Sequence, residues 1–368
     1  MGQLTTFPQQ QVEPKCSYFG TCGGCAFQDL EYAAQLELKR NSVQEALSSF
    51  SCQSAFQVYP TTPSPKPYHY RHMISLTVKR RHGVLRMGFM GRDGHGFLPV
   101  ETCPIADERI SQFLPQALAK LETLPPKRRF RTSQIVLRVG DDGDIITSLR
   151  SDRGRKLECM VLGKQFSYSV SSFFQNNYSI LESFVQTIRS SLRGGLKADE
   201  AISDSEIASL TSFVRNDVGG TLFDLYSGVG LFGILLADSY EHVIGIEEGY
   251  EAVQYAQQNA ERNQVENILF REGKVEALLP ELSLAVRKPL HVIVDPPRTG
   301  LKSEVVRSLL KLPVDRLVYV SCSLDSLVRD LKLLLKRFQI AAVQPIDLFP
   351  QTKHIETIVL LEPKDASF

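Results

Sequence analysis

Residues 221–237, TLFDLYSGVGLFGILLA, are the stretch that decides the fold. TLFDLY is a short apolar strand, the SGVG turn holds Gly228 and Gly230, and LFGILLA is an apolar helix. Glycines at this place let the backbone turn tightly and approach a ligand closely. The order of strand, glycine turn and helix predicts the first unit of a ligand-binding α/β sheet.

The sequence that follows repeats this alternation. Helical stretches separate four short apolar segments, HVIGIE (242–247), ILFREG (268–273), HVIVDPP (291–297) and LVYVSC (317–322). Such alternation indicates βαβ units and a parallel sheet. The final segments, at 340–350 and 354–363, are two strands with a short connection, which predicts an antiparallel hairpin at the edge of that sheet. We therefore expect an α/β, Rossmann-like domain over residues 166–368.

The sequence before residue 166 has a different character. From 71 to 163, short strand-like segments are separated by Gly and Asp turns, with one helical stretch at 107–123. This pattern predicts a mainly antiparallel, α+β region over residues 1–165. A helical pattern at 29–49, opened by a possible Asp29 cap, precedes a Pro-rich connector at 60–67. That helix, near 30–50, is an element that could pack on the later domain instead.

Composition places the chain among ordinary globular proteins. Hydrophobic residues make up 43% and charged residues 23% of its 368 positions. No apolar run approaches the roughly 18 residues that a membrane helix needs. The N-terminal MGQLTTFPQQQ has neither a basic start nor an apolar stretch, unlike a signal peptide. We expect a cytoplasmic protein with no membrane partner.

Charge is unevenly distributed along the chain. Residues 60–160 contain 18 Lys and Arg against 10 Asp and Glu, so the rest carries about −7 of the overall +1. Basic runs lie at 79–81 and 127–131, and the same segment contains aromatic residues such as Tyr68 and Phe89. A solvated basic face explains this pattern as well as a polyanionic partner does. The segment therefore permits an RNA partner without requiring one.

The glycine loop alone leaves the ligand open. Gly233 follows Gly230 by three positions, which also fits a dinucleotide fingerprint, and a turn without any ligand would use the same glycines. Glu247, at the end of the second strand, can accept hydrogen bonds from both hydroxyl groups of a ribose. Asp295-Pro-Pro-Arg298 follows the fourth strand, at the edge where open α/β sheets bind ligands. An aromatic residue in place of Arg298 would suggest methylation of an exocyclic base amine.

Cys322 directly follows an apolar strand and precedes a helix that begins near Asp325. A depressed thiol pKa is expected near a helix N-terminus. A small buried residue is the commonest role of a free Cys, but the shared sheet edge with Asp295 and Glu247 favours a nucleophile. Methylation of uracil at carbon 5 requires a nucleophile such as a thiolate, because addition of the thiolate to carbon 6 makes carbon 5 electron-rich. Glu356, at the start of the last strand, is the candidate base for the carbon-5 proton, although such residues are usually solvated.

Three of the seven cysteines lie within ten residues, at Cys16, Cys22 and Cys25. An odd number of cysteines in a cytoplasmic chain argues against a disulfide framework and favours metal or catalytic roles. Cys52 and Cys159 have no evident partner and are expected to be structural.

Taken together, these motifs resemble the RNA 5-methyluridine methyltransferase family over about residues 16–363. The matching motifs are Phe173-Phe-Gln175-Asn-Asn177, Asp224-Leu-Tyr-Ser-Gly-Val-Gly230, Asp295-Pro-Pro-Arg298, Ser321-Cys322-Ser323 and His354-Ile-Glu356. The resemblance implies S-adenosyl-L-methionine as methyl donor, with Cys322 as nucleophile and Glu356 as base. It further implies a set of cofactor or uracil contacts, namely Gln175, Tyr226, Gly228, Gly230, Glu247 and Asp295.

The chain is most similar to the iron–sulfur branch of the family, which acts on 23S ribosomal RNA. Cys16, Cys22 and Cys25 match its C-x5-C-G-G-C motif and Cys103 matches its distant fourth ligand, which implies a 4Fe-4S cluster. From the residues alone, zinc is the second choice for four thiolates. Two departures stand out. The chain begins just before the cluster motif, without the β-barrel RNA-binding domain of many members, and no adenine acceptor is recognisable at 271–274.

The sequence therefore predicts a monomeric enzyme that transfers a methyl group to carbon 5 of a uridine in RNA, through a covalent bond between Cys322 and carbon 6. A ribosomal RNA is the expected substrate and a transfer RNA is the alternative. The cluster is expected to have a structural role. Two other classes stay open, an iron–sulfur or NAD-linked oxidoreductase and a non-catalytic RNA-binding protein with the same fold.

Overall fold

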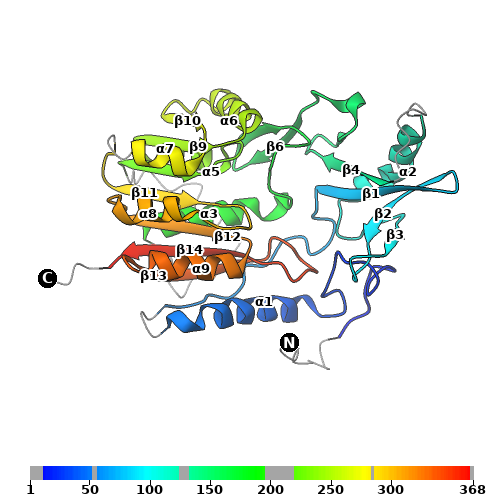
Figure 1. The fold of residues 1–368 in the computed structure, drawn as a ribbon, viewed down its shortest axis with the longest axis horizontal. Helices are drawn as coiled ribbons and strands as arrows, with labels where there is room; N and C mark the ends of the chain where they lie inside the picture. The colour runs from blue at the N-terminus through cyan, green and yellow to red at the C-terminus, as the bar shows by residue number, and fades with distance from the viewer. Residues whose placement is uncertain (1–10, 52–55, 124–131, 195–218, 283–285, 365–368) are drawn as a thin grey trace.

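The structure is a computed structural model that describes residues 11–51, 56–123, 132–194, 219–282 and 286–364. Cys52 and the basic run at 127–131 lie outside the described residues. Figure 1 shows two sheets side by side, a large one wrapped by helices and a smaller one beside it. Within the described ranges, no helix combines the length and apolar character that crossing a bilayer requires.

The larger sheet has seven strands in the order β10-β9-β8-β11-β12-β14-β13. The first five are parallel, and β14 runs antiparallel to both β12 and β13. The bounds are β8 Thr221–Leu225, β9 His242–Glu247, β10 Ile268–Glu272, β11 Leu290–Val294, β12 Arg316–Ser321, β13 Phe338–Ile346 and β14 Glu356–Pro363. The predicted hairpin is present, with its second strand inserted between β12 and β13.

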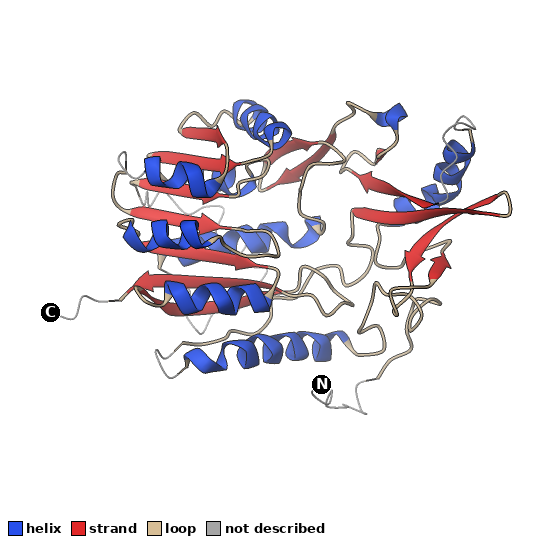
Figure 2. Ribbon diagram, in the orientation of Figure 1, coloured by secondary structure: helices blue, strands red, loops and turns tan. Residues whose placement is uncertain are grey.

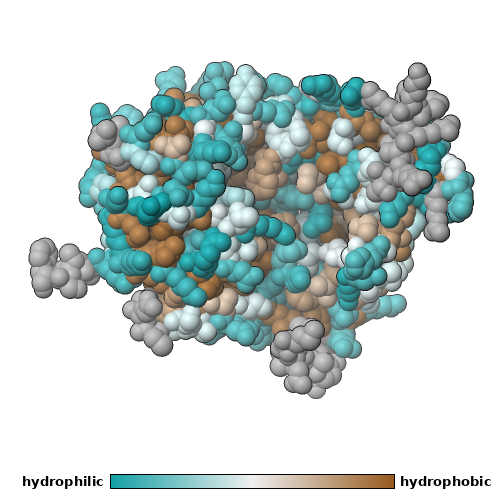
Figure 3. Space-filling view, in the orientation of Figure 1, coloured by the Kyte–Doolittle hydropathy of each residue, from teal (hydrophilic) through white to brown (hydrophobic). Residues whose placement is uncertain are grey.

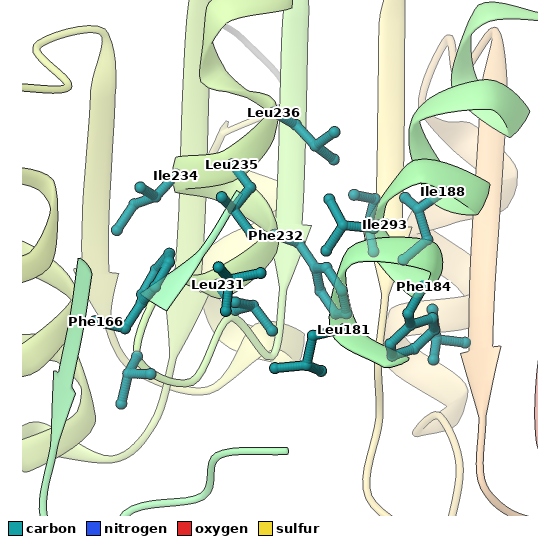
Figure 4. Packing of buried hydrophobic residues seen from close by; sticks show 14 of the residues in the cluster. Phe166, Leu181, Phe184, Ile188, Leu231, Phe232, Ile234, Leu235, Leu236 and Ile293 are labelled. Carbon is teal, nitrogen blue, oxygen red and sulfur yellow. The ribbon is translucent and has the colours of Figure 1, made fainter. Parts of the chain in front are cut away.

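Helices cover both faces of this sheet because its central strands are apolar on both sides. One layer contains α3 (Leu181–Arg193), α5 (Leu231–Leu236) and α6 (Tyr250–Arg262). The other contains α7 (Val275–Leu282), α8 (Ser303–Lys311), α9 (Leu324–Leu334) and α1 (Tyr32–Leu47). Figure 4 shows the first layer, where Phe184 of α3 meets Phe232 of α5 edge to face at 5.5 Å between ring centroids.

The early helix α1 packs against α9 and β13, so it contacts the larger sheet. Its N-cap is Glu31, which makes no capping hydrogen bond, so the cap lies two residues after the predicted Asp29. Lys39 donates to Asp347 over 2.5 Å in a buried ion pair that joins α1 to the connection after β13. Tyr32 donates to the same carboxylate over 2.8 Å.

The smaller sheet is antiparallel, in the order β3-β2-β1-β4-β5. Helix α2 covers it with one apolar face, and Asp107 caps that helix by accepting from the backbone of Arg109. The bounds are β1 Met73–Arg81, β2 Val84–Met90, β3 Phe97–Pro99, β4 Thr132–Val139, β5 Ile145–Thr147 and α2 Glu108–Glu122. The α2 bounds match the helical stretch predicted at 107–123.

A separate hairpin, β6 (Leu157–Val161) and β7 (Lys164–Tyr168), connects the two sheets in sequence and packs on α6 (Figure 2). Asn259 of α6 pairs with both backbone groups of Ser167, and its amide also donates to the carbonyl of Val229 over 3.1 Å. Because Val229 lies in the glycine loop, this one side chain fastens the hairpin to that loop.

Candidate active site

The glycine loop has the backbone shape that the sequence predicts. Gly230 has φ +87°, and a Cβ there would lie 2.7 Å from the ring of Phe270, so no larger residue fits. Gly228 has φ +53° and no atom within 4 Å of where a Cβ would be, so its outer side is open. Tyr226 also has a positive φ of 66°, which is uncommon for a residue with a side chain. Such strained backbone conformations cluster at functional sites.

Glu247 joins the ends of the first two strands. One carboxylate oxygen accepts from the backbone of Gly228 over 3.0 Å and the other from the backbone of Gly249 over 2.8 Å. Each oxygen has a further lone pair. The carboxylate is therefore held in position beside the open face of Gly228, as a ribose-binding group would need to be.

Asp224 is a buried acid that the sequence analysis did not select as a site residue. One of its oxygens accepts from the backbone of Gly233 over 2.8 Å, and the other has no partner among the described residues. Burial, and secondarily the charge of Glu247, raises the pKa of Asp224 to about 7. A charged residue within the apolar strand TLFDLY was the available sequence signal.

The turn that follows β11 is fixed by α9. Asp330 accepts from the backbone of Leu301 over 2.7 Å, and Gly300, at φ +74°, lies so close to Arg329 and Asp330 that a Cβ would clash. The turn holds Asp295 at the carboxyl end of its strand, where burial and the charge of Asp224 raise the pKa of Asp295 to about 7.

Cys322 and Glu356 are 34 positions apart in sequence, and the adjacent strands β12 and β14 bring them together. Ser321 of β12 pairs with Thr357 of β14, so the next antiparallel pair places Cys322 opposite Glu356. The hydroxyl of Ser321 accepts from the backbone of Ser323 over 3.2 Å, which fixes the turn around the thiol.

Glu356 is only 4% exposed, and one of its oxygens has no partner among the described residues. Burial and the charge of Asp295 raise the pKa of Glu356 well above its usual value, while Arg298 opposes the shift. A buried carboxylate with a raised pKa is suited to proton abstraction near neutral pH.

The thiol of Cys322 differs from the sequence expectation. Its pKa is raised, because burial and the carboxylates of Glu356 and Asp295 disfavour the thiolate, and Arg298 offsets only part of this. The predicted depression by the helix N-terminus is therefore wrong for the ligand-free protein, because burial of the thiol, the largest cause of the shift, depends on the tertiary fold. Arg298, exposed beside both groups, was noted as a motif residue but not as a site residue.

Gln175 lies in the loop between β7 and the turn at Tyr178. Its side chain is buried and makes no hydrogen bond to any described residue, whereas Phe173 is 69% exposed. Asn177 donates to the carbonyl of Leu348 over 3.2 Å, and thereby ties this loop to the β13–β14 connection that leads to Glu356. Figure 3 shows the face of the molecule hollowed near its centre, between the two sheets.

The four predicted cluster cysteines line one cavity of about 80 Å³ in the smaller-sheet region. These thiols are Cys16, Cys22, Cys25 and Cys103, and Arg71 and Gln28 lie in the same wall. Burial raises the pKa of Cys25 to about 11 and also raises the pKa of Cys22 and Cys103, while Arg71 opposes each shift. The structure therefore brings together cysteines that are up to 87 positions apart.

Within the described ranges, no group of three or more His, Cys, Asp or Glu side chains converges on a point where a single metal ion could be bound. A tetrahedral zinc site needs four sulfurs about 2.3 Å from one ion. The four thiols share a cavity without meeting that requirement. Cys159 is buried in the core of the larger-sheet region.

Comparison with known proteins gives a consistent result. The family model described as tRNA (Uracil-5-)-methyltransferase matches residues 205–364. An uncharacterised RNA methyltransferase of Clostridium tetani is 30% identical over 96% of this chain and 85% of its own length. A tRNA (uracil(54)-C(5))-methyltransferase of Schizosaccharomyces pombe is 29% identical over 94% of this chain and 65% of its own length.

Among solved structures, the fold is similar to a tRNA (uracil-54, C5)-methyltransferase of Pyrococcus abyssi in complex with S-adenosyl-L-homocysteine. The TM-score is 0.68 at 24% identity, covering 92% of this chain and 85% of that one. The predicted α/β, Rossmann-like methyltransferase fold is confirmed.

Proposed function

The chain belongs to the S-adenosylmethionine-dependent RNA uracil-C5 methyltransferases, and from this premise we propose that it methylates a uridine of 23S ribosomal RNA through a covalent bond from Cys322. Family membership decides against the oxidoreductase and the non-catalytic RNA-binding protein that the sequence left open. The observation that supports the mechanism is the place of Cys322, one residue beyond the β12–β14 ladder, close enough to the buried Glu356 for its charge to raise the pKa of the thiol.

The edge of the sheet fits S-adenosylmethionine. Gly228 leaves open space next to the fixed carboxylate of Glu247, which can accept the two ribose hydroxyls. The unpartnered oxygen of Asp224 lies under the same loop. The sulfonium supplies the methyl group, and its positive charge favours ionised forms of nearby acids and thiols. Tyr226, Gly230 and Gln175 complete the proposed contact set.

In the proposed reaction, the Cys322 thiolate forms a bond to carbon 6 of uracil and the electron pair moves to the ring oxygen as an enolate. Carbon 5 then takes the methyl group, leaving S-adenosyl-L-homocysteine. Glu356 removes the proton from carbon 5, the double bond reforms, and the carbon–sulfur bond breaks to restore the thiolate. In the ligand-free protein the thiol is protonated, so we propose that the sulfonium and Arg298 together favour its ionisation.

Tritium release from [5-³H]uridine RNA tests this function. We expect release that depends on S-adenosylmethionine and is lost in Cys322→Ala. Release that continues in the variant would contradict the role of Cys322.

The RNA partner is proposed to dock on the smaller sheet, within the N-terminal part at residues 1–165, and to present its uridine to the catalytic domain, residues 166–368, on which α1 of the N-terminal part packs. Lys79 and Arg80 of β1 and Arg86 of β2 provide cations for phosphates, and the exposed Phe173 offers a ring for base stacking. Transfer RNA is the second candidate, which the Schizosaccharomyces pombe relative favours. Mapping 5-methyluridine in 23S and transfer RNA from cells lacking the gene distinguishes the two.

We further propose a 4Fe-4S cluster in the cavity lined by Cys16, Cys22, Cys25 and Cys103. A cluster binds each thiolate through a different iron, so its ligands surround a cavity without converging on one ion, as zinc ligands must. Arg71 in the cavity wall would offset the charge of the thiolates. Iron and sulfide analysis after anaerobic purification tests the cluster, and stoichiometric zinc would contradict it. Light scattering tests the proposed monomer.

A further inference from the structure

We infer that Arg138 is a positioning residue of the methyl-transfer site, because its guanidinium holds the loop 169–177 that carries Phe173 and Gln175. Arg138 lies on β4 of the smaller sheet, whereas that loop leads into the catalytic domain. The inference rests on the proposed function, since it takes Gln175 as a contact of the bound reactants. It assigns to the smaller sheet a part in catalysis that is separate from RNA docking and from the thiol cavity.

The contacts of Arg138 are unusual for an arginine. Its side chain is 1% exposed and heads the fully buried side chains by volume. One terminal nitrogen donates to the carbonyls of Ser172 over 2.6 Å and Ser169 over 3.4 Å, and the other donates to the carbonyl of Phe174 over 2.8 Å. The planar fork of an arginine can meet several acceptors in a fixed geometry, which a lysine cannot reproduce.

No carboxylate pairs with this buried charge among the described residues. Its further neighbours include Tyr178 and the ring of Tyr168, which lies 4.5 Å from the guanidinium carbon, and Phe174 stacks on the Tyr168 ring at 4.4 Å. Burying a charge without an opposite charge costs free energy. Because the two terminal nitrogens of the guanidinium donate to three carbonyls of the loop, we infer that Arg138 holds the loop in its shape.

The same loop is fastened to β1 at its other end. The side chain of Asn176 accepts from the backbone of Met73 over 2.6 Å and donates to its carbonyl over 3.1 Å. The ring of His72 stacks on Tyr178 at 3.7 Å. Adjacent strands of the smaller sheet, β4 and β1, therefore hold both sides of the loop, with Phe173 facing outward and Gln175 inward.

Arg138→Gln removes the fork and leaves a shorter, uncharged polar side chain. We expect kcat to fall by roughly tenfold to a hundredfold, because a small displacement of a positioning group costs about that much in rate. We expect the fall in kcat to exceed any rise in KM for RNA, since the proposed phosphate contacts on β1 and β2 stay in place and only Phe173 lies in the displaced loop. Arg138→Lys, which can satisfy one carbonyl at a time, should give an intermediate kcat.

Hydrogen exchange separates positioning from general destabilisation. In Arg138→Gln, peptides covering 169–177 should exchange faster while peptides from the larger sheet match the wild type. The matched control is Arg307→Gln, which removes an exposed arginine of α8 whose contacts, with Glu304 and the carbonyl of Ser303, lie within its own helix, and it should leave all readouts unchanged. If Arg138→Gln does not fold, Arg138→Lys carries the test by the same measurements.

Two outcomes separate the failure of this inference from that of the proposed function. A wild-type protein that forms no 5-methyluridine overturns the proposed function and the inference with it. A methylating wild type whose kcat and loop exchange are matched by a folded Arg138 variant overturns the inference alone. Exchange that rises equally throughout the molecule in that variant also overturns the inference alone.

Discussion

The two cysteine-bearing regions of this molecule place the same side chain beside different sets of charges. At the edge of the seven-stranded sheet, Cys322 faces the carboxylates of Glu356 and Asp295, which add to burial in raising the thiol pKa. In the cavity beside the smaller sheet, Arg71 opposes the effect of burial on Cys22, Cys25 and Cys103. In both places burial alone favours the neutral thiol, so the neighbours determine what each cysteine can do.

The difference has a chemical meaning. A thiol beside two carboxylates stays protonated until a cation arrives, which suits a nucleophile that should act only when the sulfonium is bound. Thiols grouped around a guanidinium can ionise together when iron is supplied, because metal binding displaces their protons. We therefore propose that one region serves reversible covalent chemistry and the other permanent ligation.

The largest expected effect comes from removing the nucleophile. Cys322→Ala should lower methylation by at least about 10³-fold, because no other group can activate carbon 5. Methyl transfer to RNA transcripts, followed by nucleoside mass spectrometry, measures this. Cys159→Ala, which changes a buried cysteine of the core, is the matched control and should keep most of the activity. An equal loss of methylation in both variants would contradict the proposed role of Cys322 as the nucleophile.

Replacing the base should stop the reaction at a later step. Glu356→Gln is expected to lower turnover by roughly 10²- to 10⁴-fold, because carbon 5 keeps its proton and the carbon–sulfur bond cannot break. The methylated RNA should then remain attached to Cys322 and run as a slower band on a denaturing gel. A variant that turns over slowly but forms no such adduct would show that Glu356 acts before the covalent step.

The thiol cavity should respond through stability more than through chemistry. Cys25→Ser is expected to abolish iron and sulfide binding and to lower the unfolding midpoint on the order of 5 °C. Methylation per folded molecule should fall by about tenfold at most, because neither Cys322 nor Glu356 lines the cavity. Metal analysis, calorimetry and methylation at one temperature check the three parts. A loss of methylation as large as that of Cys322→Ala would assign the cavity a direct part in the reaction.

The smallest effect is a pH dependence of the ligand-free protein. Asp224 and Asp295 each have a pKa raised to about 7, so folding favours their protonated forms. Their contribution to stability is present below the unfolded pKa, near 4, and is lost as pH rises through about 7. Asp224→Asn should flatten this decline by on the order of 2 kcal/mol.

Urea unfolding of the ligand-free protein between pH 5 and pH 8 measures that slope. Asp238→Asn, at an exposed carboxylate, is the control and should keep the wild-type slope. Stability that rises with pH in the wild type would contradict the raised pKa of the buried acids.

Local sequence was sufficient for the elements that depend on short-range physics. The alternation of strand and helix after residue 220, the glycine turn at Gly228 and Gly230, and α2 all follow from periodicity and turn chemistry within a few residues. Conversely, the start of α1 was missed by two residues, because Glu31 and not Asp29 precedes its first turn. The role of Arg138 was also missed, although a lone arginine in the apolar strand QIVLRVG was a visible signal.

What the sequence by itself determined is the class of fold and the enzyme family, because strand alternation, glycine positions and motif spacing are local properties. Tertiary structure decided which side chains meet. The insertion of β14 between β12 and β13 brings Glu356 beside Cys322, and no local pattern encodes a strand order. The raised pKa of Cys322 and the reach of Arg138 into a distant loop have the same origin, since burial and charge depend on neighbours that only folding supplies.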